Sequence, residues 1–300
     1  MLILYCQDPL NSYEVEEVFL EEARAAEAAG FQTGLIDFDV LQQGETIEGA
    51  LRKLPRFEKH QSAIYRGWML KPPVYEMLYY ELRKRKIELI NAPEQYRLTH
   101  MLPGYYRLIE EMTPRSIWLE PDQLIEPEDL LQRLDLFQGG PVIVKDYVKS
   151  CKHDWFEACY TPDSSSLAEV MRVVNGFLER QGDDLNGNLV FREYLDFKKI
   201  GEHPVSKMPL TCEYRLFVMY GKVIDWFPYW PEVVYDANVK PPVESDLKLD
   251  IHRVISEIKS NFFTLDIALA ETGEWKIIEL GDGQVSPPLK QISRSLFIKI

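Results

Sequence analysis

The sequence predicts an open parallel α/β sheet in roughly the first 95 residues, followed by an α+β region with antiparallel sheets. Two observations predict this fold class. In residues 1–90, short apolar runs alternate with helical patterns, which is the order of β-α-β units and therefore of a parallel sheet. After Gly139-Gly140 the apolar runs become longer and antiparallel in character, and they end in a hairpin around a Thr-Gly turn.

Four strands and three helices are expected in the first region. The strands are expected at residues 1–6, 31–38, 62–65 and 87–90, and the helices at 12–29, 46–54 and 72–86. Asn11 and Glu14 have the spacing of a capping box at the start of the first helix, and Gly30 follows its end. Ligands of open α/β sheets gather beyond the carboxyl ends of the strands, where Arg66 and Asn91 lie.

The second region begins with a helical pattern from 105 to 135 that prolines interrupt. Strands are then expected at 141–147, 156–160, 189–194, 211–220 and 223–228, with a closing hairpin at 261–284. Helices are expected at 166–180 and about 246–260, and loops at 181–188 and 200–210.

Composition limits the function classes. The chain has 300 residues, of which 46% are hydrophobic, which suits a packed globular protein. Its net charge of −14 argues against broad nucleic-acid or anionic-membrane binding, and no apolar stretch approaches the roughly 20 residues of a membrane span. The first residues resemble a strand rather than a signal peptide, and four scattered cysteines are expected to be reduced thiols. We therefore expect a cytoplasmic protein.

A lysine lies in the middle of the apolar strand expected at 141–147. A buried Lys145 would need an anionic partner. Two interpretations stay open: a lysine whose ammonium group reaches water at the edge of the sheet, or a lysine that binds phosphate. Lys149, Lys152 and His153 follow on an expected loop, where such charges are usually solvated.

Two further strands end in charged residues. The strand at 189–196 could present its backbone groups to an adenine edge, or could simply leave the core into water. On the strand at 211–220, Glu213 and Arg215 are two residues apart and share one face. Such an arginine can hold a phosphoryl group with two hydrogen bonds, or can form a structural pair with the glutamate.

The closing hairpin carries the strongest signal. Asp266 lies in its first strand, and Glu279 and Asp282 lie at the end of its second strand. We expect the three carboxylates to converge, in which case they repel each other unless a cation lies between them. Hard oxygen ligands suit Mg²⁺. The alternative is a set of ordinary polar residues at the end of a hairpin.

In this order, the motifs make the chain similar to the ATP-grasp family. The family pattern is a lysine strand, a strand that ends in glutamate, a Glu-x-Arg strand with a Gly-Lys turn, and an Asp followed by Glu-x-x-Asn/Asp. The corresponding residues are Lys145, then Arg192-Glu193-Tyr194-Leu195, then Glu213-Tyr214-Arg215, then Asp266 with Glu279-Leu280-Gly281-Asp282. The segments Arg66-Gly67-Trp68 and 145–150 resemble the ATP-grasp clade that is named for two arginines and a lysine.

The resemblance covers about residues 91–290 and implies a domain organisation. A pre-ATP-grasp α/β domain is expected at 1–95 and an ATP-grasp domain at 96–300, with a small lobe at about 140–190 and a large lobe at about 191–290. Two features depart from the family pattern. Asp282 replaces an asparagine that many members have, and the loop 149–153 lacks a glycine-rich sequence, so phosphate cover must come from side chains more than from bare backbone N–H groups.

The resemblance also implies a cofactor set and site residues. ATP and Mg²⁺ are expected, and the cofactor-binding residues are Lys145, Arg192, Glu193, Tyr194, Leu195 and Glu213. The expected metal ligands are Asp266, Glu279 and Asp282, and the expected catalytic residues are Arg215, Arg66 and Lys149.

The activity that the resemblance implies is that of a carboxylate–amine ligase. Such an enzyme forms an amide through an acyl phosphate and releases ADP and phosphate. The acceptor would be a small molecule, such as an amino acid, or a peptide or protein end. The alternatives are an ATP-dependent phosphotransferase on the same fold and a non-catalytic nucleotide-binding module.

Overall fold

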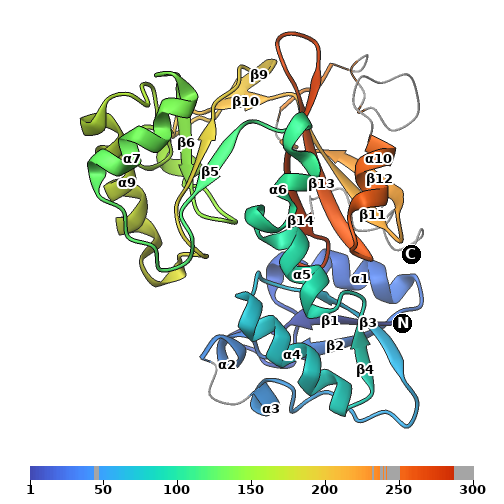
Figure 1. The fold of residues 1–300 in the computed structure, drawn as a ribbon. Coiled ribbons are helices and arrows are strands. Elements are labelled where there is room, and N and C mark those ends of the chain that lie inside the picture. Colours follow the sequence, from blue (N-terminus) through green and yellow to red (C-terminus); the bar gives the residue numbers. More distant parts are fainter. Residues whose placement is uncertain (44–46, 232, 237–238, 240, 242–250, 287–300) are drawn as a thin grey trace.

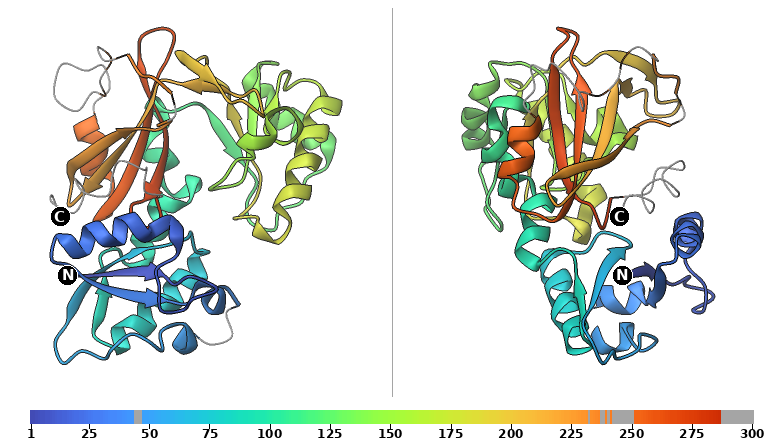
Figure 2. Two further views of the ribbon diagram at one scale, coloured as in Figure 1. Left: turned by 180° about the vertical axis from the view of Figure 1, so that it is seen from behind. Right: turned by 90° about the vertical axis from the view of Figure 1, so that its right-hand side faces the viewer.

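The computed structural model describes the chain apart from residues 44–46, 232, 237–238, 240, 242–250 and 287–300. A parallel sheet forms the N-terminal part, and antiparallel sheets follow it, which confirms the predicted fold class (Figure 1). The N-terminal sheet lies below two lobes that stand side by side, as the views in Figure 2 also show. Within the described residues, no helix has the length and apolar character that a membrane span requires.

The N-terminal sheet has the strand order β2-β1-β3-β4, and all its pairs are parallel. Its strands are β1 (Leu2–Cys6), β2 (Gln32–Ile36), β3 (Gln61–Arg66) and β4 (Ile87–Leu89). Its helices are α1 (Leu20–Ala28), α2 (Phe38–Gln43), α3 (Ile47–Ala50) and α4 (Pro72–Lys84). All five residues of β1 are buried, because the central strand of a parallel sheet is covered on both faces.

The first helix is shorter than the sequence predicted. It begins at Leu20, after a 3₁₀ turn at Glu17–Phe19, and not at residue 12. The Oδ1 atom of Asp8 accepts hydrogen bonds from the N–H groups of Leu10 and Asn11, both at 2.8 Å. These bonds hold the segment in a turn, so Asn11 does not cap a helix. Helix α3 (Ile47–Ala50) is also shorter than the helix expected at 46–54, and residue 46 lies outside the described part.

The small lobe contains a sheet with the order β5-β8-β6-β7, in which every pair is antiparallel. Its elements are β5 (Ser116–Trp118), α7 (Pro127–Leu134), β6 (Val142–Lys145), α8 (Trp155–Ala158), β7 (Tyr160–Thr161), α9 (Leu167–Gln181) and β8 (Val190–Glu193). Helices α7 and α9 cover the outer face of this sheet (Figure 1), where Val144 and Phe191 pack against Phe177. The opposite face is directed toward the large lobe.

Three expectations for this region were wrong. The segment 156–160 forms α8 and the short strand β7, because Trp155 and Ala158, three residues apart, are buried while Phe156 is half exposed. The helical pattern from 105 to 135 contains strand β5, which lies between two prolines. The expected loop 200–210 forms the hairpin of β9 (Lys199–Glu202) and β10 (Pro209–Thr211), whose Leu210 packs on the small lobe.

The large lobe contains an antiparallel sheet with the order β12-β11-β13-β14. Its strands are β11 (Glu213–Met219), β12 (Lys222–Pro228), β13 (Phe262–Leu269) and β14 (Trp275–Asp282). Its helices are α6 (Leu102–Ile109) and α10 (Ile251–Glu257), which cover one face, and α5 (Pro93–His100), which leads up from the N-terminal sheet (Figure 1). Residues 246–250 of the helix expected at 246–260 lie outside the described part of the chain.

Short 3₁₀ turns complete the described elements, at Glu17–Phe19, Glu110–Met112, Asp135–Phe137, Lys152–Asp154 and Gly182–Asp184. The domain boundaries expected at 95/96, and the lobe boundaries after it, stay predictions.

His100, at the end of α5, generates a prediction about pH. Its side chain is buried and stacks on Tyr96, with 4.8 Å between the ring centroids. Burial lowers the pKa of His100 to about 3, and nearby Lys149 adds to this effect. The unfolded chain, with a histidine pKa of about 6.5, therefore binds more protons than the folded chain below that pH, so the free energy of unfolding falls as the pH falls.

We predict that His100→Phe flattens this pH dependence. Between pH 7.5 and pH 5, the wild type should lose about 2 kcal/mol more unfolding free energy than the variant, as measured by urea denaturation. The control is His60→Phe, since His60 is exposed. Equal pH profiles for the wild type and His100→Phe would contradict the assignment of a neutral, buried imidazole.

Candidate functional site

A row of three charged side chains crosses the sheet of the large lobe. Arg215 on β11 lies opposite Asp266 on β13, which lies opposite Glu279 on β14. Arg215 and Asp266 are buried and share two hydrogen bonds, Nε to Oδ1 at 2.8 Å and Nη2 to Oδ2 at 2.6 Å. We call these three residues the central row. Burial opposes the charge on Arg215, but Asp266 outweighs burial and raises the pKa of the guanidinium.

A β-bulge on β14 stands directly before Glu279. The register moves from Asp266 opposite Glu279 to Ile267 opposite Ile277, so Ile278 is the extra residue. Arg192 on β8 donates from Nη2 to the Ile278 carbonyl at 2.5 Å. Burial lowers the pKa of Arg192, and no carboxylate among the described residues pairs with it. Arg192, expected to bind the cofactor, therefore also fixes the bulge that orients Glu279.

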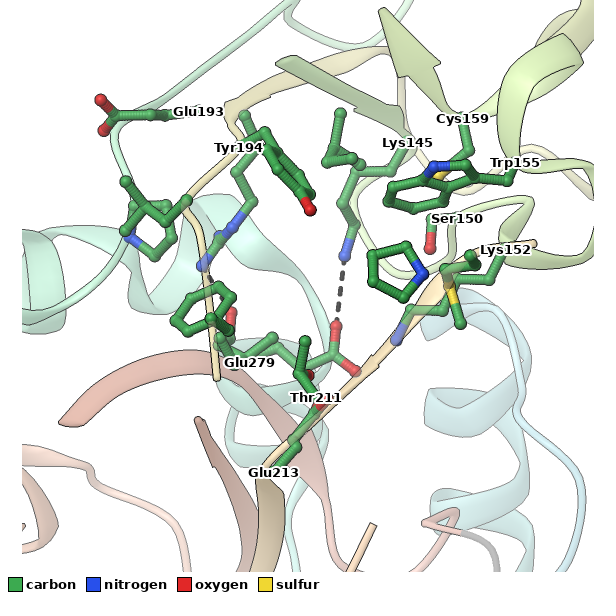
Figure 3. Close-up of a pocket in the computed structure, with 18 of the residues that line it drawn as sticks. Lys145, Ser150, Lys152, Trp155, Cys159, Glu193, Tyr194, Thr211, Glu213 and Glu279 are labelled. Atoms are coloured by element: carbon green, nitrogen blue, oxygen red, sulfur yellow. Dashed lines mark hydrogen bonds and ion pairs between the residues drawn. The ribbon is translucent and has the colours of Figure 1, made fainter. Parts of the chain in front are cut away.

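Lys145 on β6 joins the small lobe to the central row. Its side chain is 7% exposed, and its Nζ lies 3.3 Å from Oε2 of Glu279 and 3.3 Å from the Val148 carbonyl (Figure 3). Glu279 is thus the anionic partner that a buried Lys145 needs. Burial alone would raise the pKa of Glu279, but Lys145, Lys152 and Arg215 outweigh it and lower the pKa. The carboxylate of Glu279 is therefore ionised at neutral pH.

A pocket lies between the two lobes, next to Glu279 of the central row. The apolar part of its lining includes Ile143, Trp155, Tyr194, Leu195 and Met208. The polar part includes Lys145, Lys152, Thr211, Glu213 and Glu279, and the amino group of Lys145 lies over Glu279 (Figure 3). A ligand with a flat apolar part and a charged part would match this mixed lining.

The strand end expected to meet an adenine edge contributes to the apolar lining of the pocket. The Tyr194 N–H donates to the Pro141 carbonyl at 3.0 Å and is therefore occupied. The Glu193 carboxylate pairs with Arg115 at 2.8 Å and points away from the pocket centre (Figure 3). The Leu195 N–H has no hydrogen-bond partner in the described part of the chain, which leaves one backbone donor at this edge.

Two polar side chains of the pocket lack hydrogen-bond partners within the described residues. Glu213 is 4% exposed, and its Oε1 accepts no hydrogen bond within the described residues. Burial raises the pKa of this carboxyl, while Lys152 opposes the shift. Lys152 comes from the 3₁₀ turn Lys152–Asp154, and its Nζ lies 5.0 Å from the ring centroid of Tyr229 and 5.6 Å from that of Trp230. A buried polar atom without a partner is costly, so the free Oε1 of Glu213 indicates a ligand at this position.

Asp282 does not join the central row. Successive residues of a strand face opposite sides, and Asp282 lies three residues beyond Glu279, opposite Phe263. Its Oδ2 accepts from Nδ2 of Asn91 at 2.6 Å, and its Oδ1 accepts from the Gln284 N–H at 3.0 Å. Burial raises the pKa of Asp282 to about 6. The expected convergence of three carboxylates therefore reduces to two, because the side chain of the third faces the N-terminal sheet.

Arg66 lies at the same junction and does not line the pocket. Its guanidinium, 1% exposed, makes two bonds to Glu22, at 2.7 and 2.9 Å, and a third to the Gly283 carbonyl at 2.5 Å. A Cβ at position 283 would lie 2.7 Å from the ring of Phe262, so glycine is needed for this close approach. Arg66, expected to be catalytic, is thus engaged with Glu22 and Gly283 in the structure, and its catalytic role stays a prediction.

Lys149 also lies outside this pocket. Its side chain is exposed and lines a second cleft, together with Lys71, Val74 and Asp184. That cleft lies between the N-terminal domain and the small lobe, and the loop that carries Lys149 separates it from Lys145.

The sequence pattern places Lys152 among solvated loop charges, and so did not predict that it lines the pocket. It also missed Trp230 and Met208 in the pocket wall. Only the Tyr229-Trp230 pair after β12 could have pointed to this arrangement, since two adjacent aromatic residues are able to hold a cation.

The donor set of the central row fits a magnesium ion. Mg²⁺ in nucleotide enzymes is usually bound by one or two carboxylates together with substrate phosphates and water. Asp266 and Glu279 are hard oxygen donors on facing strands, and each retains free lone pairs. No cluster of three metal-binding side chains exists in the described part of the chain, so the phosphates would have to supply further ligands.

A two-lobed α+β clamp with a lysine, a Glu-x-Arg strand and paired carboxylates between its lobes defines a class of nucleotide-dependent enzymes. The chain belongs to the ATP-grasp family: residues 134–297 match the model of an ATP-grasp domain, that of family 3 of the clade named for two arginines and a lysine. No curated protein matches the chain significantly.

Solved structures show the same fold. The RimK domain ATP-grasp protein from Sphaerobacter thermophilus DSM 20745 is 12% identical with a TM-score of 0.56, and 100% of this chain and 98% of that chain are covered. D-alanine–D-alanine ligase from Bacillus anthracis is 12% identical with a TM-score of 0.56, covering 99% and 94%. The ATP-grasp ligase PsnB, complexed with minimal precursor, Mg and ADP, is 13% identical with a TM-score of 0.53, covering 99% and 96%. At these identities the likeness shows the fold alone.

We predict that Arg66 acts through stability. Arg66→Met should lower the free energy of unfolding by about 3–5 kcal/mol, because it leaves the Glu22 carboxylate buried without its partner. The double variant Arg66→Met/Glu22→Leu should recover part of this loss, as measured by denaturant unfolding. A fully stable Arg66→Met protein with a raised KM for the acceptor would instead place Arg66 in the acceptor site.

Proposed function

We propose that this protein is an ATP-dependent ligase that activates a carboxylate as an acyl phosphate and joins it to an amine. The observation that carries the proposal is the ion pair of Lys145 with Glu279 of the central row, in a pocket that also has an apolar and aromatic lining. Membership of the ATP-grasp family supports it, and so does the likeness to ligases of that fold.

We place the base of ATP against the apolar lining of the pocket. The unpaired N–H of Leu195 would donate to the adenine edge, and Ile143 and Met208 would contact its faces. Glu213, with its free Oε1, would accept a hydrogen bond from the nucleotide. The triphosphate would then extend toward Lys145, whose ammonium group already lies over Glu279.

Asp266 and Glu279 would hold Mg²⁺ on the phosphates. When bound, the ion supplies neutralisation of the charge that develops on the phosphate oxygens. Arg215 keeps both oxygens of Asp266 fixed through its two hydrogen bonds, so this ligand is oriented before any ligand arrives. Arg192 does the same for Glu279 through the bulge.

In the proposed reaction, an oxygen of the substrate carboxylate attacks the γ-phosphorus of ATP, and ADP leaves. The amine of the second substrate then attacks the carbonyl carbon of the acyl phosphate. Inorganic phosphate leaves, the amine loses a proton, and an amide bond has formed. Lys145 offsets the negative charge on the phosphates, and Trp155 and Met208 keep bulk water from the apolar lining.

We place the acceptor in the second cleft, next to Lys149. This cleft lies beyond the carboxyl end of β3, where open α/β sheets bind ligands. Lys149 and Lys71 outnumber the one acidic side chain of its lining, Asp184, and Val74 gives it an apolar wall. This lining suits the carboxylate of an amino acid, a peptide or a protein end. The loop that separates this cleft from the pocket also contacts the proposed phosphate site, because its Val148 carbonyl accepts a hydrogen bond from Lys145. We expect the enzyme to work in the cytoplasm, where ATP is available.

We predict that Glu279→Gln abolishes ADP formation. The substitution removes one of the two carboxylates of the central row, the one that pairs with Lys145, and should leave the fold unchanged. A coupled ADP assay and circular dichroism measure the two effects. The matched control is Glu274→Gln, on the exposed turn of the same hairpin. Normal turnover by Glu279→Gln would show that the metal assignment is wrong.

We predict that Lys145→Ala weakens ATP binding by about 1–3 kcal/mol, the scale of a lost charged hydrogen bond. Calorimetric titration with ATP and Mg²⁺ measures the change. Lys199→Ala removes a lysine from the surface strand β9 and should bind ATP as the wild type does. Unchanged affinity in Lys145→Ala would remove this residue from the nucleotide site.

A screen for phosphate release tests the reaction class. For a ligase, release should require both a carboxylate and an amine, offered as amino acids, peptides and protein ends. Release or transfer that needs only a hydroxyl compound would instead show a phosphotransferase, and tight ATP binding without turnover would show a binding module.

A further inference from the structure

Two backbone N–H groups of the loop after β6, those of Val148 and Lys149, are already bound to a carboxylate. The Oδ1 atom of Asp146 accepts from the Val148 N–H at 2.6 Å and from the Lys149 N–H at 2.5 Å. Oδ2 of the same carboxylate accepts from the Asn186 N–H at 2.9 Å, which ties the loop to the segment before β8. An anion therefore cannot be bound by these N–H groups without breaking the turn.

Lys152 brings a positive charge to the pocket from the next turn of the chain. It is partly buried, and Figure 3 shows its amino group pointing into the pocket toward the side where Glu213 and Glu279 lie. The other cations there are engaged: Lys145 pairs with Glu279, and Arg215 pairs with Asp266. Nζ of Lys152 makes no hydrogen bond or ion pair within the described ranges of the chain, so its three N–H donors are open to a ligand.

Two aromatic rings hold this ammonium group in place. Tyr229 and Trp230 follow β12 in the large lobe, and their ring centroids lie 5.0 and 5.6 Å from Nζ. The Tyr229 N–H donates to the Glu213 carbonyl at 2.9 Å, which fixes the ring against β11. A cation over aromatic faces keeps its charge while part of its hydration shell is removed. Burial opposes the charge, but Tyr229, Glu213 and Glu279 outweigh it and raise the pKa of Lys152.

We propose that Lys152 is a second phosphate-binding cation, which crosses from the small lobe to the large lobe and takes the part that backbone N–H groups of a glycine-rich loop would play. This inference rests on the proposed function, because it assumes that a nucleoside triphosphate occupies the pocket. It names a residue of this chain that neither the motifs nor the family match assigns.

The test compares nucleotides that share a base and differ in phosphates. Calorimetric dissociation constants are measured for ATP, ADP and adenosine with Mg²⁺, on the wild type, Lys152→Ala, Lys152→Arg and the surface control Lys199→Ala. Lys152→Ala should weaken ATP binding about 10- to 100-fold, the effect of a lost charged hydrogen bond, and leave adenosine binding unchanged. Lys152→Arg should keep most of the ATP affinity. If Lys152→Ala weakens ADP binding as much as ATP binding, the contact is to the α- or β-phosphate; if ADP binding is weakened less, the contact is to the γ-phosphate.

The aromatic support has its own readout. Tyr229→Leu should weaken ATP binding about 2- to 30-fold, because the ammonium group loses one ring. Tyr229 also lies 5.0 Å from the guanidinium carbon of Arg215, so the double variant Lys152→Ala/Tyr229→Leu separates the two contacts: binding equal to that of Lys152→Ala shows that the ring acts through Lys152, and a further loss shows an effect through Arg215.

Two results would overturn the inference: an equal loss for ATP and adenosine in Lys152→Ala, which shows a structural role, or no loss for ATP. If the wild type binds ATP and Lys145→Ala weakens it while Lys152→Ala does not, only this inference fails. If the wild type binds no ATP, the proposed function fails as well.

Discussion

The register of three strands is the constraint on which the site depends. Only the pairing of β11 with β13 and of β13 with β14 brings Arg215, Asp266 and Glu279 into one line. A shift of any strand by one residue would turn its charged side chain to the apolar face that α6 and α10 cover. The bidentate pair of Arg215 and Asp266 resists such a shift, because breaking it would leave a buried charge without a partner.

The same strand, β14, connects the site to the N-terminal domain. Glu279 faces the pocket, while three residues later Asp282 and then Gln284 are bonded to the N-terminal sheet. Gln284 accepts from the Tyr65 N–H and donates to the Tyr75 hydroxyl, and the Gly283 carbonyl accepts from Arg66. This network fixes the end of β14, three residues after Glu279. A movement of the N-terminal domain would therefore shift Glu279 as well.

The sequence predicted the fold class because it follows from local patterns. The same patterns singled out Lys145 and the central row, which the structure brings together, while their binding roles stay predictions. The lysine strand, the Glu-x-Arg strand and the hairpin carboxylates each stand at positions that alternation defines. The place of Asp282 was not predictable in the same way. Its distance along the strand suited a metal ligand, but the face it occupies depends on the bulge at Ile278 and on Asn91, which is 191 residues away. Arg66 likewise met Glu22 only through tertiary packing.

A crystal structure with a non-hydrolysable ATP analogue and Mn²⁺, located by its anomalous signal, tests the central claim most directly. The account predicts the base near Leu195, the metal bound to Asp266 and Glu279, and Asp282 still bonded to Asn91. A metal bound to Asp282, or a nucleotide outside the pocket between the lobes, would contradict it.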